Sequence, residues 1–311
     1  MIYYTKPLAN SIYYHLKPII PRLFQIWLRR QIFFRKISLF HNIWPIDQQA
    51  GEPPVFWPGW PENKRFALIL THDVDTAKGM HNCWKLANQE EELGFHSSFN
   101  FVPERYKVST SFRHYLDENG FEVGVHGLNH DGKLYESRKI FKNRAERINT
   151  YLKDWNAVGF RSPAMHHNLE WIHDLDIEYD ASTFDTDPFE PQSDGVRTIF
   201  PFWVKENDDH PGYIELPYTL PQDFTLFILM KEKTIDVWKK KLEWVAEKGG
   251  MVLLNTHPDY MNFEKRDNRI DEYHAAYYTD LLKFILSNFK GQYWHVLPKE
   301  IAHFWRSNYN S

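Results

Sequence analysis

The stretch Phe66-Ala67-Leu68-Ile69-Leu70-Thr71-His72-Asp73-Val74-Asp75 decides how the rest of the chain is interpreted. Its first five residues form a continuous apolar run, which is the pattern of a strand buried on both faces. Two carboxylates, Asp73 and Asp75, follow at the end of that run. In extended backbone, side chains two residues apart point to the same side. The sequence therefore predicts that both carboxylates face one site.

Short apolar runs of this kind alternate with helical patterns from residue 64 onward. The later predicted strands are residues 98–102, 121–125, 159–160, 179–181, 213–216, 251–255 and 294–297. Apolar residues at helical spacing lie between them, for example Ile140, Phe141, Ala145, Ile148 and Leu152. This alternation predicts an α/β domain with a parallel sheet, either open or closed as a barrel.

Polar side chains follow several of these strands at the point where each strand ends. His126-Gly127-Leu128-Asn129-His130 follows residues 121–125, Arg161-Ser162-Pro163 follows residue 160, and Thr256-His257 follows residue 255. The carboxyl ends of parallel strands open on one face of such a fold, and active residues collect there. We therefore expect one site to contain Asp73, Asp75, His126, His130, Arg161 and His257.

The residue types in this set point to metal chemistry. Two histidines four residues apart, as at His126 and His130, can reach one metal ion from a single turn. One Asp and two His leave coordination positions open for water and substrate, and the second carboxylate is then free to act as a base. Each pattern alone also fits a turn, a helix cap or a surface ion pair. Their joint occurrence at successive strand ends favours an active site.

On these residues, the sequence resembles the polysaccharide deacetylases of carbohydrate esterase family four, which contain the NodB-homology domain, over about residues 64–300. The family motif T-F-D-D corresponds to Thr71-His72-Asp73-Val74-Asp75, in the D-x-D form of some branches. The motif H-[ST]-x-x-H corresponds to residues 126–130, with Gly127 at the hydroxyl position. The motif R-x-P corresponds to Arg161-Ser162-Pro163, and L-x-H is lengthened to Leu254-Asn255-Thr256-His257.

The fourth motif of the family, D-x-x-D-W, is the poorest match. Its counterpart is Phe184-Asp185-Thr186-Asp187-Pro188, which has no Trp. The resemblance implies that Asp185 is the carboxylate that tunes the acidic histidine. The aromatic wall that the missing Trp forms in the family would then come from Trp171, Trp203 or Tyr218.

The resemblance implies a distorted (β/α) barrel of parallel strands, and the protein as a whole is expected to add an N-terminal, mainly helical extension. It also implies a hydrolase that removes an acetyl group from an N-acetylated saccharide. The implied roles are metal binding by Asp75, His126 and His130, base catalysis by Asp73, orientation of that base by Arg161 and acid catalysis by His257. Zinc is the first choice of metal, with Co²⁺, Ni²⁺ or Fe²⁺ as alternatives. Two other functions stay open: a related amidohydrolase on a small non-sugar amide, and a catalytically silent carbohydrate-binding relative.

Charge divides the chain of 311 residues into two unlike parts. The net charge is only −4, which gives no reason to expect a nucleic-acid partner. Residues 1–46, however, contain seven basic side chains and no Asp or Glu. We predict a basic, aromatic-rich extension with a Pro-rich connector over residues 1–60 and the barrel domain over residues 61–311. A helix expected near residues 21–36 either packs on the barrel or contacts a membrane surface.

Features that mark export or membrane insertion are missing from the sequence pattern. There is no apolar run long enough to span a membrane, and no apolar segment followed by a small-residue cleavage site. Cys83 is the single cysteine, so an intrachain disulfide and a cysteine-based zinc site are excluded. These observations predict a cytoplasmic protein, either free or at the membrane periphery. A saccharide linked to a lipid or a nucleotide fits that location, and the pattern leaves the oligomeric state open.

Overall fold

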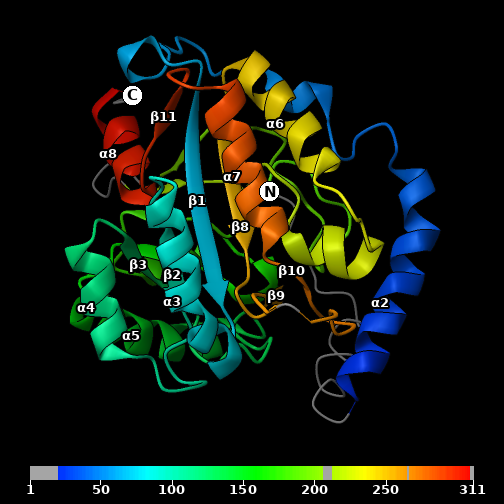
Figure 1. Cartoon of the computed structure of the whole chain (residues 1–311). Helices are drawn as coiled ribbons and strands as arrows, with labels where there is room; N and C mark the ends of the chain where they lie inside the picture. The colour runs from blue at the N-terminus through cyan, green and yellow to red at the C-terminus, as the bar shows by residue number, and fades with distance from the viewer. Residues whose placement is uncertain (1–19, 206–211, 265, 309–311) are drawn as a thin grey trace.

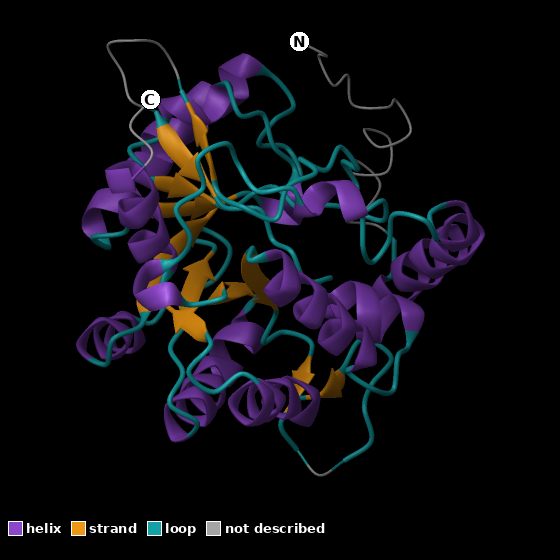
Figure 2. Ribbon diagram, turned by 90° about the horizontal axis from the view of Figure 1, so that it is seen from above, coloured by secondary structure: helices purple, strands orange, loops and turns teal. Residues whose placement is uncertain are grey.

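The computed structural model describes residues 20–205, 212–264 and 266–308, and within them a curled, mostly parallel sheet forms a distorted (β/α) barrel. In Figure 2 the strands follow an arc, with helices along its outer side. The parallel strands are β1 (Phe66–Val74), β2 (Ser98–Phe101), β3 (Glu122–His126), β4 (Gly159–Arg161), β5 (Tyr179–Asp180), β7 (Tyr213–Glu215), β8 (Met251–Thr256) and β11 (Tyr293–His295). The fold predicted from the sequence is confirmed.

Strand β1 is the longest strand of the sheet (Figure 1) and pairs with three other strands. One edge of β1 pairs with β8, and the other pairs first with β11 and then with β2. Its apolar residues 66–70 are at most 1% exposed, because helices cover one face and the barrel interior lies on the other. The strand continues past this run to Val74, so Asp73 lies within the strand and Asp75 directly after it.

The barrel is closed partly by irregular backbone. β6 (Phe202–Val204) pairs antiparallel with β7 at one end of the sheet. Beyond β7, the N–H groups of Thr219 and Leu220 donate to the carbonyl oxygen of Leu253 in β8, at 3.0 and 3.2 Å. These bonds connect the last strands to β8 without a continuous ladder. This is the distortion of the barrel.

Helices cover the outside of the sheet, and three of them begin at polar caps. They are α3 (Ala77–Glu92), α4 (Thr110–Glu118), α5 (Arg138–Asp154), α6 (Asp236–Lys248), α7 (Ala276–Asn288) and α8 (Pro298–Asn308). The side-chain oxygens of Thr76, Ser109 and Ser137 each accept a hydrogen bond from a backbone N–H in the first turn of α3, α4 and α5. A short two-stranded sheet, β9 (Met261–Asn262) and β10 (Tyr273–His274), lies beyond β8.

Helix α2 (Arg22–Lys36) belongs to the N-terminal segment and stands at the side of the barrel in Figure 1. It packs against η6, a π-helix at Phe224–Met230. Arg30 donates from Nε to the carbonyl oxygen of Ile228 at 2.8 Å, and Ile26 is fully buried beside it. The helix therefore packs on the body, which is one of the two predicted alternatives. The domain division at residues 60 and 61 stays a prediction.

The described helices include none that is both long enough and apolar enough to cross a membrane.

The Pro-rich connector packs against the barrel domain. The ring centroids of Trp57 and of Trp305 in α8 are 5.3 Å apart, and Nε1 of Trp60 donates to the carbonyl oxygen of Gly249. The sequence pattern did not predict β6, β9, β10, α4, α8 or η6.

Candidate metal centre and active site

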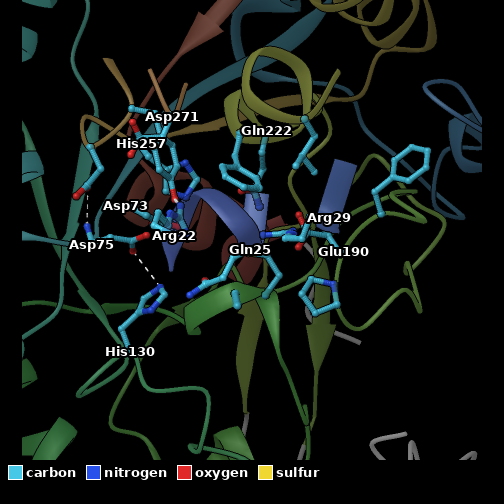
Figure 3. Close-up of a pocket in the computed structure, with 18 of the residues that line it drawn as sticks. Arg22, Gln25, Arg29, Asp73, Asp75, His130, Glu190, Gln222, His257 and Asp271 are labelled. Carbon is cyan, nitrogen blue, oxygen red and sulfur yellow. Dashed lines mark hydrogen bonds and ion pairs between the residues drawn. The ribbon is translucent and has the colours of Figure 1, made fainter. Parts of the chain in front are cut away.

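A cavity of about 1030 Å³ opens at the carboxyl ends of β1, β3 and β8, between them and α2. Asp73, Asp75, His126, His130 and His257 all line it. Figure 3 shows most of these residues at one end of the cavity. The carboxyl ends of the strands thus bring residues more than 180 positions apart, such as Asp73 and His257, into one site.

Asp75 and the two histidines form the only set of three or more His, Cys, Asp or Glu side chains with ligand atoms close enough for one metal among the described residues. Oδ1 of Asp75 lies 3.4 Å from Nε2 of His126 and 3.0 Å from Nε2 of His130. Burial lowers the pKa of His130 below its usual value even though Asp75 opposes this, which favours the neutral ring that binds a cation.

The donor atoms of this set fit a divalent cation. Nδ1 of His126 lies 3.0 Å from the carbonyl oxygen of Arg161, so this nitrogen carries the proton and the Nε2 lone pair faces Asp75. Oδ1 of Asp75 is buried and has no hydrogen-bond partner with adequate geometry. A lone pair and a carboxylate oxygen that face each other repel unless a cation lies between them, so the set is suited to holding one.

The structure explains why glycine stands at position 127, where the family motif has Ser or Thr. Its φ of +61° lies in the left-handed region, where side chains are strained. A Cβ at this position would lie 2.5 Å from Cδ of Pro163, in the loop that follows Arg161. The close approach of these two loops therefore excludes the Ser or Thr of the family motif at position 127.

Asp73 is held by three side chains in a buried environment. Asn100 and Asn255 donate to its two oxygens at 2.9 and 2.8 Å, and Nη1 of Arg161 lies 3.3 Å from Oδ1. Burial by itself would raise the pKa of Asp73, but nearby positive charges, among them Arg161 and His257, and the hydrogen bond from Asn100 lower it to about 2. Asp73 is therefore an ionised, immobile carboxylate beside the proposed metal ligands.

Arg161 is fully buried and is itself fixed in place. Its Nη1 donates to Oγ1 of Thr71 and Oδ1 of Asn255, at 2.8 and 2.6 Å, and its Nε donates to the carbonyl oxygen of Ala181 at 2.7 Å. The guanidinium thus joins β1, β4 and β8. Arg161 thus contacts Asp73 from a fixed position, and the orienting role that the resemblance implied stays a prediction.

His257 is paired with Asp223, which stands at the start of η6. Nδ1 of His257 lies 2.7 Å from Oδ1 of Asp223, and the backbone N–H of His257 donates to Oδ2 at 2.8 Å. The hydroxyl of Tyr273 donates to the same Oδ2 at 3.0 Å. Burial would lower the pKa of His257, but Asp223, together with Asp75 and Asp73, raises it to about 10. The imidazole is therefore held in its protonated form at neutral pH.

The structure does not place Asp185 beside His257, and that prediction is corrected. Asp185 instead accepts a 2.5 Å hydrogen bond from Nζ of Lys241, in a pair whose side chains are each only 1% exposed. Burial raises the pKa of Asp185 to about 6, although Lys241 opposes this. The local match to D-x-x-D-W was misleading, since the carboxylate that serves His257 lies 38 residues further along the chain at Asp223.

The aromatic wall also comes from other residues than predicted. Trp171 packs against Tyr135 and Phe141, and Tyr218 is buried with its hydroxyl on Asp187 and Glu190. Trp203 lies under Arg306. The described aromatic residues that line the cavity are Phe33, Phe189, Phe224 and Tyr260.

No protein-family model matches this sequence, and no curated protein has a significant sequence match. Solved structures, however, are similar over most of the chain. A protein of Mycobacterium smegmatis described as a polysaccharide deacetylase superposes with a TM-score of 0.61 at 17% identity, over 80% of this chain and 92% of the other. A protein of Pseudomonas aeruginosa PAO1 with the same description gives 0.61 at 13% identity, over 85% and 98%.

A third solved structure with this fold has a different description. It is an allantoinase, Puue, with a TM-score of 0.60 at 15% identity, over 86% of this chain and 99% of the other. The chain therefore has the fold of the polysaccharide deacetylases, which the sequence resemblance implied, and the allantoinase shares that fold.

Proposed function

We propose that this protein is a metal-dependent hydrolase that removes the acetyl group from an N-acetylated saccharide. The observation that carries the proposal is the convergence of three groups in one cavity: the Asp75, His126 and His130 set, the ionised Asp73 held by Arg161, and the protonated His257 held by Asp223. A base, an acid and a cation site at one place are the parts that amide hydrolysis needs. The fold shared with polysaccharide deacetylases supports the same function.

Within this proposal the side chains divide the proton transfers. Asp73, kept ionised and aimed by Arg161, Asn100 and Asn255, takes the proton of the attacking water. His257 donates a proton to the departing amine, which is otherwise a poor leaving group. Because Asp223 engages Nδ1, the nitrogen left for this transfer is Nε2. A divalent cation at Asp75, His126 and His130 would polarise the acetamide carbonyl and make water more acidic.

Release of acetate from N-acetylglucosamine oligomers tests the proposal. We expect acetate from protein loaded with Zn²⁺ or Co²⁺, loss of the activity with a chelator, and recovery when metal is returned. Protein that binds these sugars but releases no acetate under any metal would favour the silent carbohydrate-binding alternative. Acetate release that is indifferent to chelation would contradict the metal-dependent function.

A metal amidohydrolase that acts on a small non-sugar amide is the second candidate, and the likeness to the allantoinase is what favours it. The same cation site and proton-transfer groups serve that reaction as well. Assays on allantoin and simple N-acetylated amines, run beside the sugar oligomers, separate the two. Higher kcat/KM on the small amides would replace the deacetylase function by this one.

We propose in addition that the outer face of α2 contacts an anionic membrane surface. Leu23, Phe24, Trp27 and Phe34 lie on one side of the helix and are 50–57% exposed. Arg35 flanks this face, and residues 1–46 contain no acidic side chain. An exposed apolar face beside basic residues is the pattern of a helix that lies in the interface of an anionic bilayer.

Sedimentation with lipid vesicles tests the membrane contact. We expect binding to vesicles that contain phosphatidylglycerol, weaker binding to pure phosphatidylcholine, and about a tenfold loss of affinity in the double variant Phe24→Ser, Trp27→Ser, because two half-buried aromatic side chains are removed from the interface. Phe56→Ser is the matched control, since Phe56 is 94% exposed but lies outside α2. Equal losses in both variants, or no binding by the unmodified protein, would reject this contact.

A further inference from the structure

Helix α2 presents a second, polar face to the active-site cavity. Arg22, Gln25, Arg29 and Lys36 line the cavity from this helix. The first three are three and four residues apart and therefore share one face. In Figure 3, Arg22 and Gln25 lie between the catalytic end of the cavity and Arg29, which lies at the other end beside Glu190. The N-terminal segment thus supplies one wall of the proposed substrate site.

This wall is held in position by a third face of the same helix. Ile26 and Phe33 are 0% and 2% exposed in the core. Arg30 between them donates to the carbonyl oxygens of Ile228 and Ile270, at 2.8 and 3.2 Å. These contacts fix the rotation of the helix, so that the face with Arg22 and Arg29 is turned toward the cavity. The backbone positions of both arginines at the cavity wall are therefore set by the packing of α2 on the body.

Arg22 reaches toward the catalytic groups. Its Nη2 donates to the hydroxyl of Tyr260 at 3.1 Å, and the ring of Tyr260 lies 5.2 Å from that of His257. Asp75 and Asp271 are close enough to raise the pKa of Arg22 together with Tyr260, which has the largest effect.

Arg29 lies over the ring of Phe224, with Cζ 4.5 Å from the ring centroid. Its acidic neighbours are Glu190 and, deeper in the body, Asp187, which both bond the hydroxyl of Tyr218 at 3.0 Å. Burial beside Asp187 raises the pKa of Glu190 to about 8, although Arg29 opposes this. The raised pKa means that Glu190 competes for Arg29 less strongly than an ordinary carboxylate would.

The distance between Arg22 and Arg29 along α2 limits the size of a group that both side chains could bind. Seven residues along a helix correspond to about 10 Å between their backbone positions, at 1.5 Å per residue. Guanidinium groups bind phosphate oxygens through paired hydrogen bonds and stay charged at every physiological pH. Both guanidiniums lie near the ring of Phe224, with Cζ of Arg22 5.7 Å and Cζ of Arg29 4.5 Å from its centroid, so both charges line the same part of the cavity wall.

We propose that the Arg22 and Arg29 face of α2 binds a phosphoryl group of the substrate, so that the preferred substrate is a phosphorylated N-acetyl saccharide. The inference rests on the proposed deacetylase function and adds the chemistry by which the substrate is selected. The phosphoryl group can belong to a lipid-linked or a nucleotide-linked sugar, which present the same chemistry to the arginines.

Two measurements on the metal-loaded protein test this. The first is calorimetric binding of glucosamine 1-phosphate against glucosamine. The second is the ratio of KM values for N-acetylglucosamine and its 1-phosphate. We expect tighter binding and lower KM for the phosphorylated form. We expect Arg29→Gln to reduce that preference about tenfold or more, as for the loss of a charged hydrogen bond. Arg29→Lys should restore part of it.

The matched control is Arg35→Gln, which removes the same charge from an exposed position of α2 outside the cavity lining. An equal loss of preference in this control would mean that only the overall charge matters, and would overturn the proposal. So would equal binding of both sugars, or tighter binding of glucuronic acid than of the phosphate.

Failure of the proposed function can be told apart from failure of this inference. Protein that prefers the phosphate in calorimetry but never releases acetate would reject the deacetylase and keep the phosphate site. Acetate release without any preference for the phosphorylated sugar would keep the deacetylase function and reject the phosphate site. A lipid phosphate sugar with a short, soluble chain and a nucleotide diphosphate sugar complete the comparison. Tighter binding of either one, lost in Arg29→Gln, supports the site and identifies the source of the phosphate.

Discussion

Replacing His126 by alanine is expected to strip the protein of its metal and to lower acetate release by about a thousandfold or more, because a bound cation stabilises the transition state by several kcal/mol. Its Nε2 faces Oδ1 of Asp75 at 3.4 Å, and its other nitrogen is held by the carbonyl oxygen of Arg161. Removal of this ring leaves only two of the three donors. Metal content measured after dialysis, together with acetate release, checks the prediction.

Asp73→Asn is the matched variant for this experiment. Its side chain is bonded to Asn100, Arg161 and Asn255, and the candidate metal set does not include it. We expect this variant to keep its metal while turnover falls to a similar extent. A His126→Ala protein that retains stoichiometric metal would contradict the assignment of ligands, provided that thermal unfolding shows both variants to be folded.

His257→Ala is expected to slow cleavage of an acetamide by about a hundredfold to ten-thousandfold, which is the usual contribution of general acid catalysis. Acetyl ester cleavage should be slowed less, because an alcohol leaves more readily than an amine. Parallel kcat measurements on an N-acetyl sugar and an acetyl ester check this. Equal losses on the two substrates would remove the acid role from His257.

The variant Asp223→Asn tests the acid role of His257 through the pH dependence of kcat. A general acid must be protonated, so activity is lost as the pH rises through the pKa of His257, and a raised pKa moves that limit upward. Asp223 is the largest cause that raises this pKa. A cation at Asp75 would weaken the contribution of the other carboxylates but leave that of Asp223.

The variant should therefore move the alkaline limb of the kcat profile toward lower pH. Tyr273→Phe, which removes one donor to Asp223 but leaves its charge, is the control and should move the limb much less. An unchanged limb in Asp223→Asn would show that another group sets it.

The sequence was most informative where chemistry and strand periodicity coincide. Asp73, Asp75, His126, His130, Arg161 and His257 all follow or end apolar runs, and parallel strands bring such positions to one face whatever the intervening chain does. The fold could be predicted for the same reason. Short elements without a clear period, such as β6, β9 and η6, could not.

Asp223 and Asn255 show why the partners of the catalytic residues were harder to predict. Asp223 precedes η6, a segment of π-helix that no standard period marks, and its link to His257 depends on how that segment packs. Asn255 lies within a strand that pattern analysis treats as apolar. Asp185 illustrates the opposite error, since a short motif match outweighed the buried Lys241, 56 residues away, that pairs with it.

The partners of α2 also determine when the cavity can form. Arg30 bonds Ile228 and Arg22 bonds Tyr260, across 198 and 238 positions of the chain. Contacts of such separation close late in folding, since a long loop must be ordered before they are made. During synthesis, α2 therefore emerges well before the segments that it packs against. The face of α2 with Ile26 and Phe33 lacks its partners in that interval, and the catalytic cavity gains this wall only when η6 and the segment after β8 have formed.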